Sequence, residues 1–341
     1  MVDENRDEWI PFLNVQQVAE LEKRLEDDPE DLEARELLMR YYMVEALRSD
    51  DYVAPHLKHL IWLIESHPDS ALLSTSVCRL NFAEYNLNYR IVVDLWIQQV
   101  TKYPENPAVL GNAAYNLLTG FPSRSDAVIA RKWLLTAEKL EPYNPAWKNL
   151  LGDYHRHLSM GKKDQKAKES SLKLAMRYYR EEYDLTTDDT DKAFLLENMV
   201  ECAFEAGDFI ATDQYARALL EAAFLFEQER WKWNYGNAIH NGHIYLGKIA
   251  LIHGDKDGAL RHLQDAAKTP GSPQLNSYGP DKTLASSLLE VGENDAVLEY
   301  FRACANFWKM EMGRLTYWID AIKNGQVIDF KSTDWFTSKE V

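Results

Sequence analysis

The chain has 341 residues, a length that suits two or three ordinary domains or one long repeat array. Hydrophobic residues make up 46% of it, an ordinary share for a folded protein. Its 54 acidic residues outnumber its 38 basic ones and give a net charge of −16, which disfavours binding to nucleic acid or to an anionic membrane surface.

The amino-terminal sequence is acidic and has no apolar segment typical of a signal peptide. Cys78, Cys202 and Cys304 are far apart and form no CxxC pair, as expected of three reduced thiols. No run of about 18 apolar residues occurs, so we expect no membrane insertion. These features predict a cytoplasmic protein.

Helical periodicity begins near the amino terminus. Val18, Leu21 and Leu25 recur at spacings of three and four residues, which places them on one face of a helix. The same spacing recurs at 57–64, and no alternating apolar and polar stretch is framed by hairpin turns. The pattern predicts an all-α protein.

Prolines mark regular junctions between the predicted helices. Pro29, Pro68, Pro104 and Pro142 are separated by 39, 36 and 38 residues. Proline cannot continue the preceding helix, and its fixed φ suits the first turn of the next. A period of about 30 to 40 residues, each unit made of two helices, is typical of a stacked helical repeat.

Small and large residues alternate inside these units. The first helix of such a unit contains a Leu-Gly pair. The second helix contains Ala, Leu and Ala at fixed spacing. Gly and Ala let two helices approach closely, and leucine fills the gap. The residues that form the pattern are Leu110, Gly111, Ala130, Leu134 and Ala137 in one unit, and Leu246, Gly247, Ala259, Leu263 and Ala266 in another.

This pattern resembles the tetratricopeptide repeat (TPR) superfamily, in a divergent form of bacterial type. The clearest repeats are 104–160 and 240–270. The resemblance implies a right-handed α-solenoid of about seven stacked antiparallel helix hairpins. We expect a single domain over 1–341, with 313–341 as its C-terminal cap and tail.

Arrays of this family usually bind partners on a concave face lined by first helices. Asparagine and tyrosine can bond an extended peptide backbone there without a fixed charge. The alternative is that these are merely solvated polar positions. Ala108 occupies the place where a chaperone-tail clamp needs lysine, which disfavours that ligand. The resemblance places on this face Asn112, Tyr115, Asn116, Asn149, Arg156 and Lys248.

Asparagine and histidine form a stripe in the segment 231–251. Asn234, Asn237, His240 and Asn241 recur at spacings that put them on one side of a helix, and Trp233 lies at its start. Such a stripe costs free energy if buried without partners. We therefore expect it to face a ligand groove or a polar network between helices.

His240 and His243 lie one helical turn apart, a spacing that lets two imidazoles share a metal. The sequence positions no third ligand beside them, so we predict neither a metal site nor a cofactor.

Two segments depart from the repeat. The loop 269–280 is longer than a repeat needs and either closes a pocket over the stripe or is a plain spacer. The tail carries Phe330, Trp335 and Phe336, which either pack back onto the fold or fray.

No catalytic motif is present, which favours a binding protein over an enzyme. We predict a scaffold that holds a protein or peptide partner in a helical groove. The first alternative is a small-molecule-binding protein or enzyme subunit with a pocket at 234–243. The second is a structural subunit of a homo-oligomer.

Overall fold

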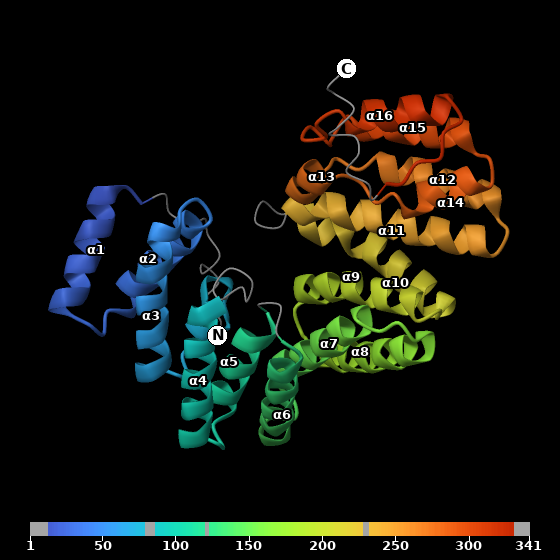
Figure 1. Ribbon diagram of the computed structural model, residues 1–341. Helices are drawn as coiled ribbons and strands as arrows, with labels where there is room; N and C mark the ends of the chain where they lie inside the picture. The colour runs from blue at the N-terminus through green and yellow to red at the C-terminus, as the bar shows by residue number, and fades with distance from the viewer. Residues whose placement is uncertain (1–12, 79–85, 120–122, 228–231, 331–341) are drawn as a thin grey trace. The chain divides into compact units, whose positions relative to one another are not determined.

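The computed structural model describes residues 13–78, 86–119, 123–227 and 232–330 (Figure 1). In these ranges the regular elements are sixteen α-helices and four short 3-10 helices, without a strand. The prediction of an all-α protein is confirmed. Among the same residues, no helix combines the length and the apolar character needed to cross a membrane.

The chain divides into two compact units, Met1–Tyr154 and His155–Val341. The prediction of one continuous array stays a prediction. Unit 1 contains α1 (Val15–Asp27), α2 (Leu32–Ala46), η1 (Asp50–Tyr52), α3 (Val53–Ser66), η2 (Ala71–Ser74), η3 (Ser76–Cys78), α4 (Asn86–Lys102), α5 (Pro107–Leu118), α6 (Arg124–Leu140) and the start of α7 (Pro145–Met160). Unit 2 contains the end of α7, then α8 (Gln165–Leu185), α9 (Asp189–Glu205), α10 (Phe209–Ala222), η4 (Ala223–Glu227), α11 (Lys232–Ile252), α12 (Lys256–Ala267), α13 (Pro273–Tyr278), α14 (Thr283–Glu290), α15 (Asn294–Cys304) and α16 (Arg314–Lys323).

Helices end and begin at the proline junctions. Pro104 lies between α4 and α5, and Pro142 lies between α6 and α7. At the start of α5 the Asn106 side chain accepts hydrogen bonds from two backbone N–H groups, and Pro107 takes the first helical position. The side chain satisfies donors that have no partner inside the helix, and proline has no donor to lose.

The segment after Pro68 is an exception, because it forms η2 and η3 instead of an α-helix. The Asn112 amide donates to the carbonyl oxygens of Pro68 and Ser70, at 3.0 and 2.9 Å. The Asn116 amide donates to that of Leu73 at 2.7 Å. These side chains therefore satisfy carbonyl groups that an α-helix would satisfy with its own backbone.

Within each unit, helices that follow one another in the chain pack together, as α5 with α6, α9 with α10 and α11 with α12 (Figure 1). Ala259, Leu263 and Ala266 on α12 are fully buried, at 0% exposure. In unit 1 the Trp147 ring lies directly against Gly111, where a side chain would collide with it. Small residues thus mark the close helix contacts, as the pattern predicts.

The carboxyl-terminal end of unit 2 has an aromatic core. Phe301, Trp308 and Trp318 are buried together between α15 and α16. The Phe330 ring packs on this cluster, with its centroid 5.1 Å from that of Trp318. Trp335 and Phe336 lie outside the described residues.

We expect Gly111→Ala to lower the free energy of unfolding by about 1–3 kcal/mol, because the new methyl group overlaps the Trp147 ring in a packed core. Gly161→Ala is the matched control, since no atom lies within 4 Å of the position its methyl group would take. Urea denaturation of both variants measures the difference. Equal stability of the two variants would contradict this account of the α5–α7 contact.

Candidate functional site

The predicted groove residues of α5 face inward. Asn112 and Asn116 are only 5% and 3% exposed, and their amide N–H groups bond backbone carbonyls of the 68–73 segment. Tyr115, on the same helix, is half-buried. The two asparagines hold their own chain in place, so they give no free hydrogen-bond donors to a partner.

The other predicted residues are spread over unit 2 and the end of unit 1. Asn149 and Arg156 are half-buried on α7, and the Arg156 guanidinium contacts the Glu201 carboxylate at 3.2 Å. The Lys248 ammonium lies 4.6 Å from the ring centroids of both Phe204 and Tyr245. The side chain of Trp233 lies outside the described residues.

The asparagines of the α11 stripe form a buried hydrogen-bond network. The Asn234 amide donates to the Glu197 carboxylate on α9 at 3.1 Å. The Asn237 amide donates to the Asn234 side-chain oxygen at 2.9 Å, and the Ser272 hydroxyl donates to the Asn237 oxygen at 2.6 Å. This network joins α9 and α11 to the start of α13 and satisfies polar groups that would be costly to bury alone.

His240 is fully buried on α11 and uses both ring nitrogens. The backbone N–H of Asp281 donates to Nε2 at 3.0 Å, so Nδ1 carries the proton and donates to the Ala266 carbonyl at 3.1 Å. Burial lowers the pKa of His240 below its ordinary value. A neutral His240 therefore anchors the end of the 269–280 loop, and neither nitrogen remains for the metal that its spacing to His243 suggested.

The beginning of the same loop is held against α11 by Thr269. Its hydroxyl donates to the Gly236 carbonyl at 2.7 Å and accepts from the Gly271 N–H at 3.2 Å. A Cβ atom on Gly236 would overlap the Gly271 carbonyl, so the loop lies this close only because position 236 has no side chain. The loop is thus fixed at both ends to the stripe helix.

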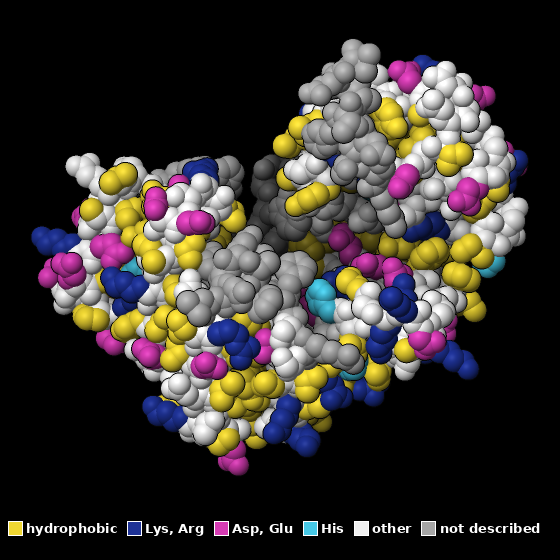
Figure 2. All heavy atoms as spheres, viewed as in Figure 1, with side chains coloured by type: hydrophobic (Ala, Val, Ile, Leu, Met, Phe, Trp, Pro, Cys, Tyr) yellow, Lys and Arg dark blue, Asp and Glu magenta, His cyan; other side chains and the backbone are white. Residues whose placement is uncertain are grey.

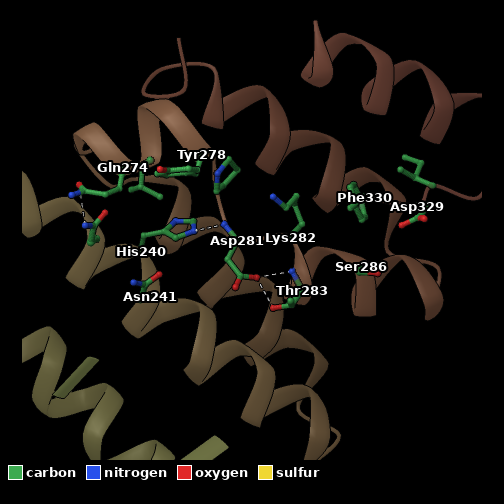
Figure 3. Close-up of a pocket in the computed structure, with 15 residues that line it drawn as sticks. His240, Asn241, Gln274, Tyr278, Asp281, Lys282, Thr283, Ser286, Asp329 and Phe330 are labelled. Atoms are coloured by element: carbon green, nitrogen blue, oxygen red, sulfur yellow. Dashed lines mark hydrogen bonds between the residues drawn. The ribbon is translucent and has the colours of Figure 1, made fainter. Parts of the chain in front are cut away.

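A cavity of about 560 Å³ lies between the stripe and this loop (Figure 3). Tyr278, which belongs to its wall, is 78% exposed. The stripe residues Asn237, His240 and Asn241 therefore share one cavity. The other wall residues are Gln274, Leu275, Tyr278, Gly279, Pro280, Asp281, Lys282, Thr283, Ser286, Ile328, Asp329 and Phe330.

Several polar groups in the cavity wall have no partner among the described residues. The Asn241 amide and the Ser286 hydroxyl make no hydrogen bond there, and the Lys282 ammonium makes no ion pair. Lys282 lies 5.9 Å from the Trp318 ring centroid, and burial lowers its pKa. Leu275 and Phe330 add apolar surface to the wall. The cavity therefore combines unbonded donors and acceptors with apolar contact area, as ligand pockets do.

Sequence reasoning missed the wall residues beyond the loop. Lys282 and Ser286 belong to the start of α14 and carry no motif, and Ile328 comes from a segment without periodicity. The unusual length of the 269–280 loop and the Asn/His stripe pointed to this region, but neither identified these wall residues. Phe330 was recognised only as a residue able to pack back.

The Glu197 carboxyl at the end of the network is half-buried, and this burial raises its pKa to about 7. The hydrogen bond from Asn234 works in the opposite direction, because it favours the carboxylate. Glu197 therefore changes charge near neutral pH.

The chain matches no protein-family model, and no curated protein is similar to it in sequence. The resemblance to TPR proteins therefore stays a prediction.

We expect Glu197→Gln to stabilise the protein at pH 8 and to have little effect at pH 5. The folded pKa of about 7 exceeds the ordinary value of 4.5, so the folded state holds the proton more tightly and wild-type stability falls as pH rises through 7. Glutamine keeps the oxygen that accepts from Asn234 and cannot ionise. The gain at pH 8 is about 1–3 kcal/mol.

Thermal denaturation of the wild type and the variant across pH 5–8 measures this difference. Glu290→Gln, at an exposed position, is the control and is expected to follow the wild-type pH profile. Parallel profiles for wild type and Glu197→Gln would show that this carboxyl does not titrate near neutral pH.

Proposed function

We propose that this protein is a non-catalytic binding protein and that the cavity beside α11 holds a peptide segment of a partner. The observation that carries this proposal is a set of polar side chains, Asn241, Lys282 and Ser286, that have no hydrogen-bond or ion-pair partner among the described residues and share a cavity with apolar walls. All three side chains are half-buried. A ligand that buries them further must bond them, because a polar group without a partner is costly once it is buried, so the cavity favours ligands with matching polar groups.

The neutral groups suit a peptide backbone. The Asn241 side chain offers a donor and an acceptor, and Ser286 offers a hydroxyl that serves as either. The Gln274 amide, whose oxygen accepts from Asn237 at 3.4 Å, keeps its NH₂ group for a ligand. An extended peptide presents N–H and C=O groups in alternation, which matches this mixture.

Lys282 adds a preference for a carboxylate. Its ammonium is half-buried and makes no ion pair among the described residues, although the neighbouring Asp281 carboxylate acts on it electrostatically. A carboxylate from an acidic side chain or from a peptide terminus would form a charge-assisted hydrogen bond there. We therefore propose a peptide that places one carboxylate at Lys282.

The proposed architecture is a TPR-like, right-handed solenoid of helix hairpins. Three observations support it: chain-neighbour helices pack together, the Ala259, Leu263 and Ala266 positions are buried, and Trp147 lies against Gly111. In this proposal the partner site differs from the groove predicted on α5, since Asn112 and Asn116 bond their own chain.

The charge distribution supports a protein or peptide partner and no nucleic acid. On the face that Figure 2 shows, basic and acidic side chains are interspersed and do not gather into one basic patch. Phosphate backbones are bound by clustered lysine and arginine.

A small organic ligand with a carboxylate is the second candidate. It is favoured by the volume of about 560 Å³, within the range of about 300–1,000 Å³ usual for small-ligand sites. It is also favoured by the loop, which is fixed at both ends over the stripe.

We expect an array of short peptides, probed with the purified full chain, to give binders that depend on a carboxylate. Asn241→Ala and Lys282→Gln should each weaken the selected peptide at least tenfold, the effect of losing one hydrogen bond to a charged or partly buried group. Fluorescence anisotropy gives the dissociation constants. Asn306→Ala and Lys323→Gln, at exposed positions away from the cavity, are the matched controls.

The same four variants are then tested by NMR against a library of small carboxylic acids. If the small carboxylic acids bind and no peptide does, and if Asn241→Ala loses this binding, the small-ligand candidate is correct and the peptide is not. Ligands that bind Asn241→Ala and Lys282→Gln as tightly as they bind the wild type would show that this cavity is not the binding site. His240 and Asn237 are unsuitable test positions because both are buried and bonded within the fold.

A further inference from the structure

Two histidines and one aspartate converge where α11 packs on α12, outside the cavity. His243 comes from α11, and His262 and Asp265 come from α12, three residues apart. Gly247 lies one turn after His243, and a Cβ atom there would be 3.1 Å from that of His262. The absence of a side chain at Gly247 therefore lets the two helices approach until the imidazoles meet.

The spacing of these groups suits one metal ion. The Nδ1 atoms of His243 and His262 are 3.1 Å apart, and the ligand atoms of all three residues lie within 4.8 Å of one another. Two nitrogens bound to one tetrahedral Zn²⁺ at about 2.0–2.1 Å are themselves about 3.3 Å apart. The observed separation of 3.1 Å is close to this value, and an Asp265 carboxylate oxygen lies within 4.8 Å of both nitrogens.

The chemistry of the three groups agrees with their geometry. Imidazole nitrogen and carboxylate oxygen are the ligands that zinc takes in open sites, where three protein groups leave the fourth position to water. All three residues are half-buried, so an ion can reach them. Among the described residues, each of the two imidazoles has the other as its only hydrogen-bond partner.

The three groups lie near the cations Arg217, Arg261 and Lys268, each of which is paired with an acidic residue; Arg261 contacts Asp255 at 4.0 Å. Arg217 on the facing helix α10 is already paired with Asp213 at 2.9 Å. Lys268 contacts one Asp265 oxygen at 2.7 Å, but its side chain is 74% exposed and free to move into solvent. The other oxygen of Asp265 is available to an ion.

We infer that His243, His262 and Asp265 form a binding site for a divalent transition metal, with Zn²⁺ as the best match. The site is independent of the proposed peptide cavity. It would join α11 to α12 at the surface, in addition to their apolar contact.

The test is calorimetric titration of the chelator-treated full chain with Zn²⁺. We expect one ion per chain, and at least tenfold weaker binding in His262→Gln and in Asp265→Asn. Co²⁺ is the second probe, since its visible absorption bands report a tetrahedral site and should disappear in both variants. The controls are His253→Gln and Asp257→Asn, exposed positions just after α11 and in the first turn of α12. Both variants should bind both ions as the wild type does.

Absence of stoichiometric Zn²⁺ binding by the wild type would overturn the inference. Unchanged binding in His262→Gln and Asp265→Asn would overturn it as well, because the ion would then lie elsewhere. Circular dichroism without metal establishes that each variant is folded. If the His262 variant unfolds, Asp265→Asn still decides, since Asp265 is half-buried and lies outside the apolar core.

Discussion

The organisation of unit 2 depends on how closely other segments approach the backbone of α11. Gly236, Gly242 and Gly247 lie on this helix, and a Cβ atom on any of them would collide with a neighbour. Gly236 meets the 269–280 loop, Gly242 meets Leu220 on α10, and Gly247 meets Leu284 on α14. Glycine at each position destabilises the helix by about 1 kcal/mol relative to alanine, but it permits the close contact. Both the cavity and the histidine pair are consequences of these contacts.

Close packing against α11 also forces polar groups into the interior, where each needs a partner. The stripe meets this need in two ways. Asn234 and Asn237 form a network that extends from Glu197 to Ser272, and His240 bonds backbone groups at both ends of its ring. Such bonds are directional, so they fix the position of the loop more sharply than apolar contact does. Asn241 on the same stripe is half-buried and, unlike these neighbours, makes no hydrogen bond to any described residue.

Several features could be predicted from the sequence because they depend on residues close together in the chain. The junctions at Pro104 and Pro142 follow from proline geometry, and the placement of Asn234, Asn237 and His240 along one helix follows from their spacing. At Pro68 the preceding helix ends as expected, but η2 and η3 follow instead of an α-helix, and distant amides on α5 bond the carbonyls of that segment. Whether an asparagine faces a partner or its own chain depends on what packs opposite, as Asn112 shows.

The sequence by itself determined that the chain is helical, that helix junctions lie at Pro29, Pro104 and Pro142, and that 231–251 and 269–280 are unusual. Hydrophobic periodicity and proline act within one or two turns of backbone, so their effects can be predicted from the order of the residues alone. Only the tertiary structure decided that Lys282 and Phe330 share a cavity with Asn241, and that His243 meets His262 instead of His240. These contacts join residues far apart in the chain, and their distances are set by which side chains are small enough to let helices meet.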